Sequence, residues 1–319
     1  MKRIAFNPHS WPEQPNLANQ IQSIAPKHSI LDLSHPPTEA QLAECEILFG
    51  NVAPQIINKM TAIKWVHAQT AGADAYLNSK VILANDVILT SSTGAFGISI
   101  GEYMLTTTLM LLRNMSGYMT QQTERVWKWR DNATNLYGKS ITIVGMGDIG
   151  SRYAYLCHAM GAKVTGVVRT KRASKPDYVQ NLFTTDNLKQ ALEDADIIAL
   201  AMPGTNETAG ILSRKILEGL KKGAFILNVG RGSAIDQDAL AELLGTGHLS
   251  GAALDVTNPE PLPAENPLWS APNTIITPHV SHGGRENIGG FVCDKFLRYL
   301  QDYVNGKPFE RVVDRIAGY

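Results

Sequence analysis

The stretch from Ser140 to Arg172 constrains the fold of this chain more than any other segment. It contains a short apolar run, Ile141 to Val144, of the length expected for a buried parallel strand. The next residues carry three glycines in the spacing G-x-G-x-x-G, at Gly145, Gly147 and Gly150. After a helical segment comes a second apolar run, Lys163 to Val168. A strand, a glycine turn, a helix and a second strand in this order predict a unit that binds a dinucleotide.

Each glycine has a separate steric task in such a unit. The first permits a tight turn, the second lets a pyrophosphate approach the backbone, and the third lets the helix pack closely on the strand. The helix that starts around Asp148 and Ile149 directs its free N–H groups and its positive dipole end toward the phosphates. We therefore predict that these two residues bind the cofactor together with the three glycines.

Size and composition restrict the class of protein. At 319 residues the chain is long enough for two domains, and an apolar content of 44% with 18% charged residues is typical of globular proteins. A formal net charge of zero supplies no basic field for nucleic acid or an anionic membrane, so we expect neither partner. The first residues lack the apolar segment of a signal peptide, and we expect a cytoplasmic protein.

Cysteine usage points the same way. The three cysteines, Cys45, Cys157 and Cys293, are odd in number and far apart, which favours a reducing compartment without disulfides. We interpret them as small buried residues rather than nucleophiles. No cysteines or histidines occur at ligand spacing in a plausible turn or helix, so we expect no metal site.

Apolar runs alternate with helical patterns along most of the chain, which predicts parallel sheets covered by helices on both faces. In the first half we expect strands at 3–6, 30–33, 47–49, 65–68 and 87–89, and a helix at 17–24. A long helix is expected over 98–115, continued by 125–130. Beyond residue 172 we expect strands at 196–202, 224–229, 251–256 and 274–277, and helices at 211–220 and 236–244. A final helix at 287–304 is expected to return to the first half and cover its sheet.

Two loops in the first half follow the carboxyl ends of expected strands, where open α/β sheets bind ligands. One runs from Gln69 to Asp74 and the other from Thr90 to Gly97. Ala71 and Gly72 have little side chain, so their N–H groups are able to face a small carboxylate. An ordinary strand-to-helix turn explains the same residues, and the spacing by itself favours that alternative.

Three polar residues in the second half each follow the end of a separate expected strand: Arg231, Glu260 and His279. These strand ends meet at one edge of a doubly wound sheet, beside the dinucleotide, so the side chains can share one pocket. Arginine presents a planar fork of donors to a carboxylate, and histidine exchanges a proton near neutral pH. A carboxylate beside the histidine favours the imidazolium and fixes its orientation. The set predicts catalysis, although each residue taken singly has a structural explanation.

These residues lie in motifs that resemble a known family. NVGRG at 228–232, DVTNPEPLP at 255–263 and TPHVS at 277–281 resemble signatures of the D-isomer-specific 2-hydroxyacid dehydrogenases, in a branch like the NADP-dependent glyoxylate/hydroxypyruvate reductases. The resemblance spans nearly the whole chain. One departure is Thr90-Ser91-Ser92-Thr93-Gly94, where the family pattern leads us to expect a version that contains asparagine. Which side chains of this segment shape the substrate pocket is therefore an open question.

The resemblance implies an α/β fold of two doubly wound parallel-sheet domains. A Rossmann cofactor domain, residues 98–283, is inserted into a smaller flavodoxin-like substrate domain of residues 1–97 and 284–319. It also implies a homodimer formed through the cofactor domains.

The resemblance further implies reduction of a small 2-oxoacid to the D-2-hydroxyacid by hydride transfer from NADPH. His279 serves as general acid/base, Glu260 hydrogen-bonds it and keeps it protonated, and Arg231 binds the substrate carboxylate and polarises the carbonyl. Ala71 and Gly72 fall in the loop that holds this carboxylate. Further implied contacts with the cofactor come from Pro203, Thr208, Val229, Gly230, Arg231, Asp255 and His279.

The residues after the second strand of the cofactor unit indicate which dinucleotide is bound. NAD-preferring domains place an acidic residue there for the ribose hydroxyls. In this chain the position carries Arg169, Thr170, Lys171 and Arg172, three cations and a hydroxyl that suit a 2′-phosphate. A solvated basic loop is the alternative. We predict NADP as cofactor, with NADPH preferred over NADH.

Two other functions remain open at this point. One is a non-catalytic, dinucleotide-sensing protein of the corepressor type on the same fold, and the other a dehydrogenase for another small anion such as formate or phosphite. The sequence does not identify the 2-oxoacid. It also leaves open whether Phe96, Tyr103, Trp127 and Trp129 line the pocket or belong to the core.

Overall fold

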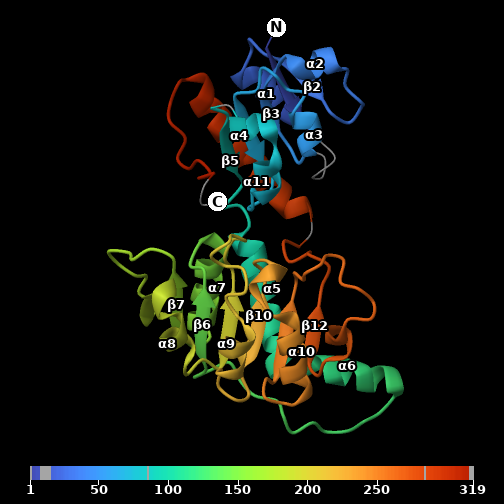
Figure 1. Cartoon of the computed structure of the whole chain (residues 1–319), viewed down its shortest axis with the longest axis vertical. Helices are drawn as coiled ribbons and strands as arrows, with labels where there is room; N and C mark the ends of the chain where they lie inside the picture. Colours follow the sequence, from blue (N-terminus) through green and yellow to red (C-terminus); the bar gives the residue numbers. More distant parts are fainter. Residues whose placement is uncertain (1, 8–15, 85, 284, 316–319) are drawn as a thin grey trace. The chain divides into compact units, whose positions relative to one another are not determined.

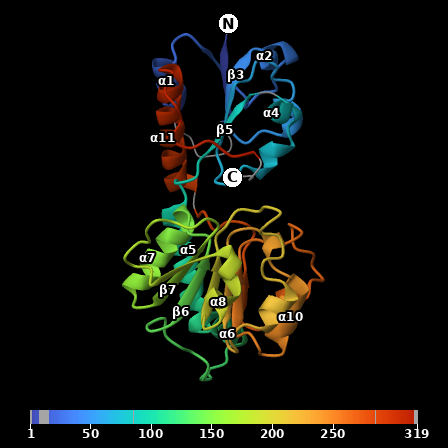
Figure 2. The same ribbon diagram turned by 60° about the vertical axis from the view of Figure 1, so that its left-hand side comes forward.

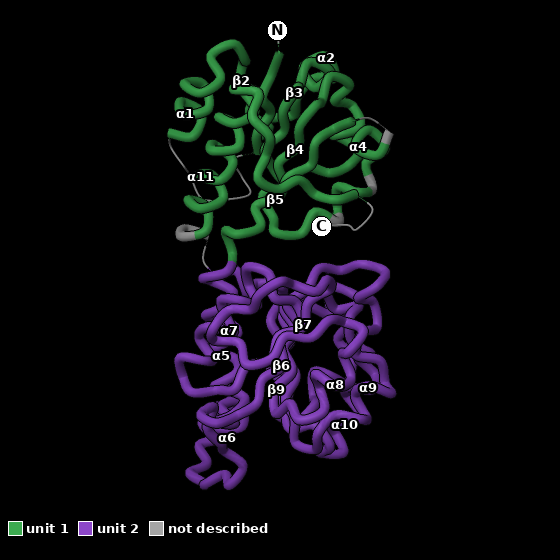
Figure 3. The backbone as a smooth tube through the Cα atoms, turned by 90° about the vertical axis from the view of Figure 1, so that its left-hand side faces the viewer, with its two compact units in different colours: residues 1–96, 284–319 green, residues 97–283 purple. Residues whose placement is uncertain are grey.

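The computed structural model describes residues 2–7, 16–84, 86–283 and 285–315 (Figure 1). The chain divides into two compact units, one of residues 1–96 and 284–319 and one of residues 97–283 (Figure 3). Each unit has its own parallel sheet.

The first unit contains a five-stranded sheet in the order β2-β1-β3-β4-β5, with all neighbours parallel. This is the doubly wound order of flavodoxin-like folds. The expected strands are confirmed within one or two residues. They are β1 Arg3–Phe6, β2 Ser29–Asp32, β3 Cys45–Phe49, β4 Trp65–Ala68 and β5 Ile88–Ser91.

Helices cover both faces of this sheet (Figure 2). The helix α11 (Arg285–Val304) packs beside α1 (Leu17–Ile24) on one face, where Phe296 stacks on Phe49 with ring centroids 4.1 Å apart. The return of the final helix to the first half is therefore confirmed. The opposite face shares a core with the remaining elements, which are α2 Glu39–Ala43, α3 Pro54–Ile57, the 3-10 helix η2 Asp74–Asn78 and α4 Lys80–Ala84.

The second unit contains a seven-stranded parallel sheet in the order β12-β11-β10-β9-β6-β7-β8. Its strands are β6 Ser140–Val144, β7 Lys163–Val168, β8 Asn181–Thr184, β9 Ile197–Leu200, β10 Phe225–Asn228, β11 Gly251–Leu254 and β12 Thr274–Ile276. The order reverses between β6 and β9, which is the point where Rossmann sheets bind dinucleotides. Two doubly wound parallel sheets confirm the expected fold class. The strand β8 is not among the expected strands, because it is a short and half-exposed edge strand whose four residues show no buried run.

Two helical layers enclose this sheet. One core joins the sheet to α8 Leu188–Leu192, α9 Arg214–Glu218 and α10 Gln237–Gly245. On the opposite face α7 (Asp148–Ala159) packs against α5 (Gly97–Leu112), and α5 also contacts β10, β11 and β12. A Cβ atom at Gly101 would come within 2.7 Å of Arg152 Cγ, so glycine permits this close contact of the two helices. Short 3-10 helices complete the unit, namely η3 Thr185–Asn187, η4 Gly232–Ala234 and η5 Pro267–Ser270.

The expected helix over 98–115 and 125–130 is wrong in its extent. The helix α5 ends at Leu112, and α6 (Met115–Glu124) begins after Asn114, whose φ of 48° lies in the left-handed region. Asparagine tolerates this backbone, and its side chain caps α6 by accepting a hydrogen bond from the N–H of Gly117. Arg125, with φ of 58°, ends α6, and residues 125–135 are not helical. The helix expected at 211–220 is likewise shorter, since α9 covers only 214–218.

The structure also bears on membrane-spanning helices and on the three cysteines. In the ranges that the structure covers, no helix combines the length and apolarity needed to cross a membrane. Cys45, Cys157 and Cys293 are all buried, and burial raises the pKa of their thiols to about 11, 12 and 12. Such thiols are not reactive nucleophiles at neutral pH.

Candidate active site

The glycine turn after β6 has the steric form of a phosphate-binding loop. Gly145 has φ of +99°, and a Cβ there would meet the backbone of Ala201 at 2.7 Å. A Cβ at Gly150 would lie 1.9 Å from the carbonyl oxygen of Gly145. Gly147, by contrast, has no atom within 4 Å of such a Cβ, and it precedes α7 without a side-chain cap. Open space beside uncapped N–H groups fits a pyrophosphate.

The basic segment Arg169–Arg172 follows β7 and is exposed. Arg172 Nη2 donates to the carbonyl oxygen of Met146 at 2.8 Å, which ties the segment to the glycine turn. Arg169 Nε lies 3.7 Å from the carboxylate of Glu207, an exposed residue of the loop after β9. The donor set therefore suits a phosphate group.

The loop after β9 is closed by its own hydroxyl groups. Thr208 Oγ1 donates to the carbonyl oxygen of Pro203 at 2.8 Å, and it accepts from the N–H of Thr205 at 2.8 Å. Thr208 therefore fixes the course of the chain just beyond the carboxyl end of β9.

Arg231 follows β10 in a tightly packed turn. A Cβ at Gly230 would lie 2.6 Å from the carbonyl oxygen of Met202, and one at Gly232 would lie 2.0 Å from the carbonyl carbon of Thr257. The Asn228 side chain accepts from the N–H of Gly230 and donates to the carbonyl oxygen of Arg231, at 3.0 and 2.9 Å. The glycines on either side thus let the backbone of Arg231 lie close to the neighbouring strand ends.

Glu260 and His279 form a hydrogen-bonded pair. His279 Nδ1 lies 2.9 Å from Glu260 Oε2, with 47% and 40% of the two side chains exposed. The second carboxylate oxygen of Glu260 accepts from the N–H of Thr257 at 3.1 Å. Because Nδ1 is engaged, Nε2 is the ring nitrogen that can exchange a proton with a bound molecule. The pair is therefore able to act in general acid–base catalysis.

Asp255 holds the backbone around His279. Its carboxylate accepts from Thr277 Oγ1 at 2.6 Å, from the N–H of Val280 at 2.8 Å and from the N–H of Ser281 at 3.0 Å. Its carbonyl oxygen accepts from the N–H of His279 at 2.9 Å. His279 has φ of 55°, a left-handed conformation that such surroundings are needed to maintain.

A tyrosine of α5 completes this arrangement. The hydroxyl of Thr277 donates its hydrogen bond to Asp255, so Thr277 Oγ1 accepts from the Tyr103 hydroxyl, 2.6 Å away. Burial raises the pKa of Tyr103 to about 12, and the phenol stays protonated as the donor. Tyr103 is therefore a half-buried residue of α5 that hydrogen-bonds the histidine turn.

The cofactor-sheet residues singled out in the sequence all follow strands of one parallel sheet. They come after β6, β7, β9, β10, β11 and β12. Parallel strands present their carboxyl ends at the same edge, so the fold brings these residues to one side of the second unit. Ala71 and Gly72 belong to the first unit, after β4.

Comparison with known proteins identifies the family. The model of the NAD-binding domain of D-isomer-specific 2-hydroxyacid dehydrogenases matches residues 105–281. The chain belongs to this family.

One relative of this chain is glyoxylate/hydroxypyruvate reductase A of Salmonella heidelberg (strain SL476). It is 30% identical over 264 residues, which cover 81% of this chain and 82% of the relative. Among solved structures, a family protein of Aeromonas salmonicida subsp. salmonicida A449 has 30% identity and a TM-score of 0.82, covering 99% of this chain and 100% of that one. An NADPH-dependent glyoxylate/hydroxypyruvate reductase of Sinorhizobium meliloti, in complex with NADP and sulfate, has 26% identity and a TM-score of 0.85, with full coverage of both chains.

The sequence alone does not show the contacts that hold the turn around His279. Thr277 lies in the TPHVS motif, but only the structure shows its hydroxyl between Asp255 and Tyr103. Tyr103 was left open in the sequence between the pocket and the core, and only the structure shows its hydrogen bond to Thr277, 174 residues away. Thr257 was part of a recognised motif, and its N–H bond to Glu260 is a detail of the folded turn.

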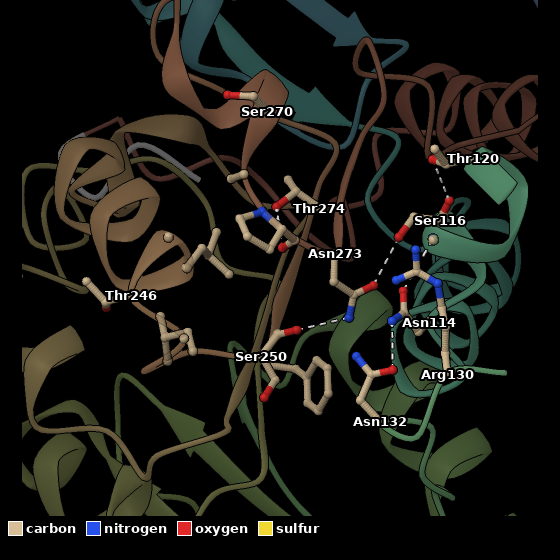
Figure 4. A pocket seen from close by; sticks show the side chains of 18 of the residues that line it. Asn114, Ser116, Thr120, Arg130, Asn132, Thr246, Ser250, Ser270, Asn273 and Thr274 are labelled. Atoms are coloured by element: carbon tan, nitrogen blue, oxygen red, sulfur yellow. Dashed lines mark hydrogen bonds between the residues drawn. The ribbon is translucent and has the colours of Figure 1, made fainter. Parts of the chain in front are cut away.

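A polar cavity of about 670 Å³ lies elsewhere in the second unit (Figure 4). It is bordered by residues of α6 and by residues that precede β11 and β12, including Asn114, Ser116, Ser250 and Asn273. Its polar groups pair with one another, as in the 3.1 Å bond from Ser116 Oγ to Asn273 Oδ1. It lies at the amino ends of these strands and contains none of the predicted site residues.

Proposed function

We propose that this chain is an NADPH-dependent reductase of a small 2-oxoacid, which it converts to the D-2-hydroxyacid. The observation that carries the proposal is the 2.9 Å pair of His279 Nδ1 and Glu260 Oε2 at the carboxyl edge of a dinucleotide-binding sheet. A sensor protein has no need of a proton donor beside its dinucleotide, so this pair favours an enzyme over the corepressor alternative.

The proposed catalytic roles follow from the chemistry of the three side chains. NADPH supplies the hydride when it is bound. His279 gives the proton on Nε2 to the carbonyl oxygen of the substrate, and in the reverse direction it removes that proton as a neutral base. Glu260 orients the ring through Nδ1 and stabilises the imidazolium. Arg231 binds the substrate carboxylate and stabilises the negative charge that develops on the carbonyl oxygen.

We assign the cofactor to the glycine turn and the strand ends beside it. The free space at Gly147 and the N-terminus of α7 receive the pyrophosphate, with Asp148 and Ile149 in the first turn of the helix. Arg169, Thr170, Lys171 and Arg172 bind the 2′-phosphate. Pro203, Thr208, Val229, Gly230, Arg231, Asp255 and His279 are the remaining proposed contacts. The Sinorhizobium structure, which contains NADP, supports this choice of cofactor.

The first unit is proposed to bind the substrate. Its Ala71 and Gly72 present backbone N–H groups to the carboxylate, while the second unit binds NADPH. We further propose a cytoplasmic homodimer in which the second units of two copies meet.

A substrate panel tests the function directly. Glyoxylate, hydroxypyruvate and larger 2-oxoacids are each offered with NADPH and with NADH, and cofactor oxidation is followed by absorbance. We expect turnover with at least one 2-oxoacid, with a higher kcat/KM for NADPH. Formate and phosphite are offered with the oxidised cofactors in the same series. Turnover with one of these anions alone, or no turnover with any compound, contradicts the proposed function.

A further inference from the structure

Three successive carbonyl groups in the loop after β4 are held by hydroxyl or amide donors. The N–H of Ser92 donates to the carbonyl oxygen of Thr70 at 3.0 Å, and Thr93 Oγ1 donates to that of Ala71 at 2.9 Å. The hydroxyl of Thr70 donates to the carbonyl oxygen of Gly72 at 2.5 Å. The loop therefore has three fixed peptide planes in a row.

Fixing these carbonyls also fixes the amides that follow. A trans peptide is planar, with its N–H pointing away from its C=O, so the N–H groups of Ala71, Gly72 and Ala73 are turned away from the donors. Within the described part of the chain, no group accepts a hydrogen bond from any of these three amides. Three adjacent unpaired N–H groups with set directions are suited to a small anion.

A buried histidine, His67, is hydrogen-bonded to a residue that contacts this loop. His67 is fully buried at the end of β4, with Nδ1 2.7 Å from Thr90 Oγ1 and Nε2 3.1 Å from Ser92 Oγ. Rings of Phe49, Phe296 and other aromatic residues surround it. Burial is the main reason that the pKa of His67 falls to about 3, so the ring is neutral at physiological pH.

The partners of His67 determine its tautomer. Ser92 Oγ donates to the carbonyl oxygen of Ala68 at 3.0 Å, so it must accept from Nε2–H of the ring. Nδ1 is then unprotonated and accepts from the hydroxyl of Thr90, which itself accepts from Trp65 Nε1 at 2.9 Å. Each polar atom of this network has a partner, and only one assignment of donors and acceptors satisfies all of the hydrogen bonds.

The place of Ser92 makes this network relevant to the loop. Pairing of β4 and β5 ends at Ala68 and Ser91, so Ser92 is the first residue beyond the ladder. Its N–H is shared between the carbonyl oxygens of Ala68 and Thr70, and its hydroxyl accepts from His67. A leucine or phenylalanine at position 67 would fill the same aromatic surroundings without burying two polar ring atoms. The imidazole of His67 hydrogen-bonds the side chain of Ser92, and the N–H of Ser92 hydrogen-bonds the loop after β4.

We propose that His67, Ser92 and Thr93 are positioning residues that aim the amides of Ala71 to Ala73 at the substrate carboxylate. The inference rests on the proposed function, because that proposal assigns this loop to the substrate. It also gives a role to two residues of the segment 90–94, which departs from the pattern of the family: Thr93 through its hydroxyl and Ser92 through its backbone N–H hydrogen-bond the loop after β4.

The test compares matched variants at each position. Thr93→Val removes the hydroxyl at nearly constant shape, and Thr93→Ser restores it. Ser92→Ala and His67→Leu remove the other two links, while His67→Gln keeps an N–H donor for Ser92. The control is Ser79→Ala, since Ser79 is equally buried in the same unit but its hydroxyl bonds Asn58 at 2.9 Å and contacts neither loop.

The readouts separate positioning from stability. KM for the best 2-oxoacid and the inhibition constant of oxamate, a non-reducible carboxylate analogue, are expected to rise at least tenfold in Thr93→Val and Ser92→Ala. NADPH affinity, measured by fluorescence titration, stays within twofold. Thr93→Ser and His67→Gln recover much of the loss, and Ser79→Ala changes melting temperature but not KM.

The outcomes distinguish the two proposals. A wild-type protein that reduces no 2-oxoacid contradicts the proposed function, and the inference with it. An active wild type with KM unchanged in Thr93→Val and Ser92→Ala overturns only the inference. A rise in KM as large in Ser79→Ala overturns it as well, because the effect is then one of general destabilisation. If His67→Leu does not fold, the two loop variants decide.

Discussion

The backbone of His279 depends on a residue that is distant in the sequence. A left-handed φ is unfavourable for a histidine, and the buried carboxylate of Asp255 compensates by accepting from the two N–H groups that follow. The imidazole is then oriented by Glu260. One acidic residue fixes the main chain and another fixes the ring, so the imidazole of the proposed proton donor is held at both its backbone and its side chain.

Replacement of His279 by alanine tests the proposed acid. We expect kcat to fall by about 10²- to 10⁴-fold, the range typical of general acid catalysis, with little change in NADPH affinity. Glu260→Gln, which keeps a hydrogen-bond acceptor but loses the charge, is expected to give a smaller loss. Steady-state kinetics and cofactor titration measure both effects. His158→Ala, an exposed histidine of α7, is the control. Near-normal turnover in His279→Ala refutes the assignment.

The buried His67 makes stability depend on pH. Its pKa is about 3 in the folded protein and near 6.5 when exposed, so the unfolded chain binds more protons between these values. Stability therefore falls as pH is lowered through this window. Between pH 7 and pH 4 the contribution is on the order of 3 kcal/mol.

Urea unfolding at pH 7 and pH 4 measures this effect. We expect the free energy of unfolding to fall more in the wild type than in His67→Gln, by on the order of 3 kcal/mol. Ser79→Ala, which removes no titratable group, should keep the wild-type pH dependence. Equal pH dependence in the wild type and His67→Gln would show that the imidazole does not titrate in this way.

At the scale of elements, the segment after β7 is the part of the chain that we propose to select the cofactor. Arg172 is tied to the glycine turn, and Arg169 lies near Glu207, while Lys171 is exposed. A 2′-phosphate would replace the carboxylate of Glu207 as the partner of Arg169. On the proposed cofactor, Glu207 would compete with the phosphate for Arg169, and its charge would lower the affinity for NADPH.

Variants of this segment test the cofactor proposal. Arg169→Ala and Lys171→Ala are each expected to weaken NADP⁺ binding by about 10-fold or more, since a charge-assisted hydrogen bond contributes about 1.5–3 kcal/mol. NAD⁺ binding should change less than twofold, and Glu207→Gln should tighten NADP⁺ binding. Calorimetric titration gives these constants. Lys222→Ala, at the amino end of β10, is the control cation. Equal losses for both cofactors would rule out a phosphate site.

At the scale of the whole molecule, two tryptophan side chains, Trp127 and Trp129, are exposed to solvent. Trp127 is fully exposed and Trp129 is 78% exposed, in the irregular segment that follows α6. Exposed aromatic side chains close together are typical of protein interfaces. They do not belong to the core of the second unit, and we propose that they lie in the contact of the proposed homodimer.

Sedimentation velocity tests this assignment. We expect a dimer for the wild type and a shift toward monomer in the double variant Trp127→Ala/Trp129→Ala, because removal of central aromatic contacts costs about 2 kcal/mol or more each. Leu83→Ala, which is exposed in the first unit, should remain dimeric. A dimeric double variant, or a monomeric wild type, contradicts this arrangement.

Local patterns were sufficient for much of the fold. The strands β1, β4 and β7 and the helix α1 lie where the apolar runs predict them, because short apolar runs and helical periods reflect burial directly. The long helix was wrong because an asparagine that accepts a left-handed backbone gives no signal in hydropathy. The edge strand β8 was missed because a half-exposed strand shows little apolar pattern.

The sequence by itself determined the dinucleotide turn and the three polar residues at the strand ends, because both are set by residue type and by position relative to a strand. Only the tertiary structure decided which groups hold them. The contacts of Asp255 with Thr277 and of Thr277 with Tyr103, and the network of His67 with Ser92, join residues 22 to 174 positions apart. Hydrogen bonds between distant segments depend on how the strands are ordered and packed, and no local pattern contains that information.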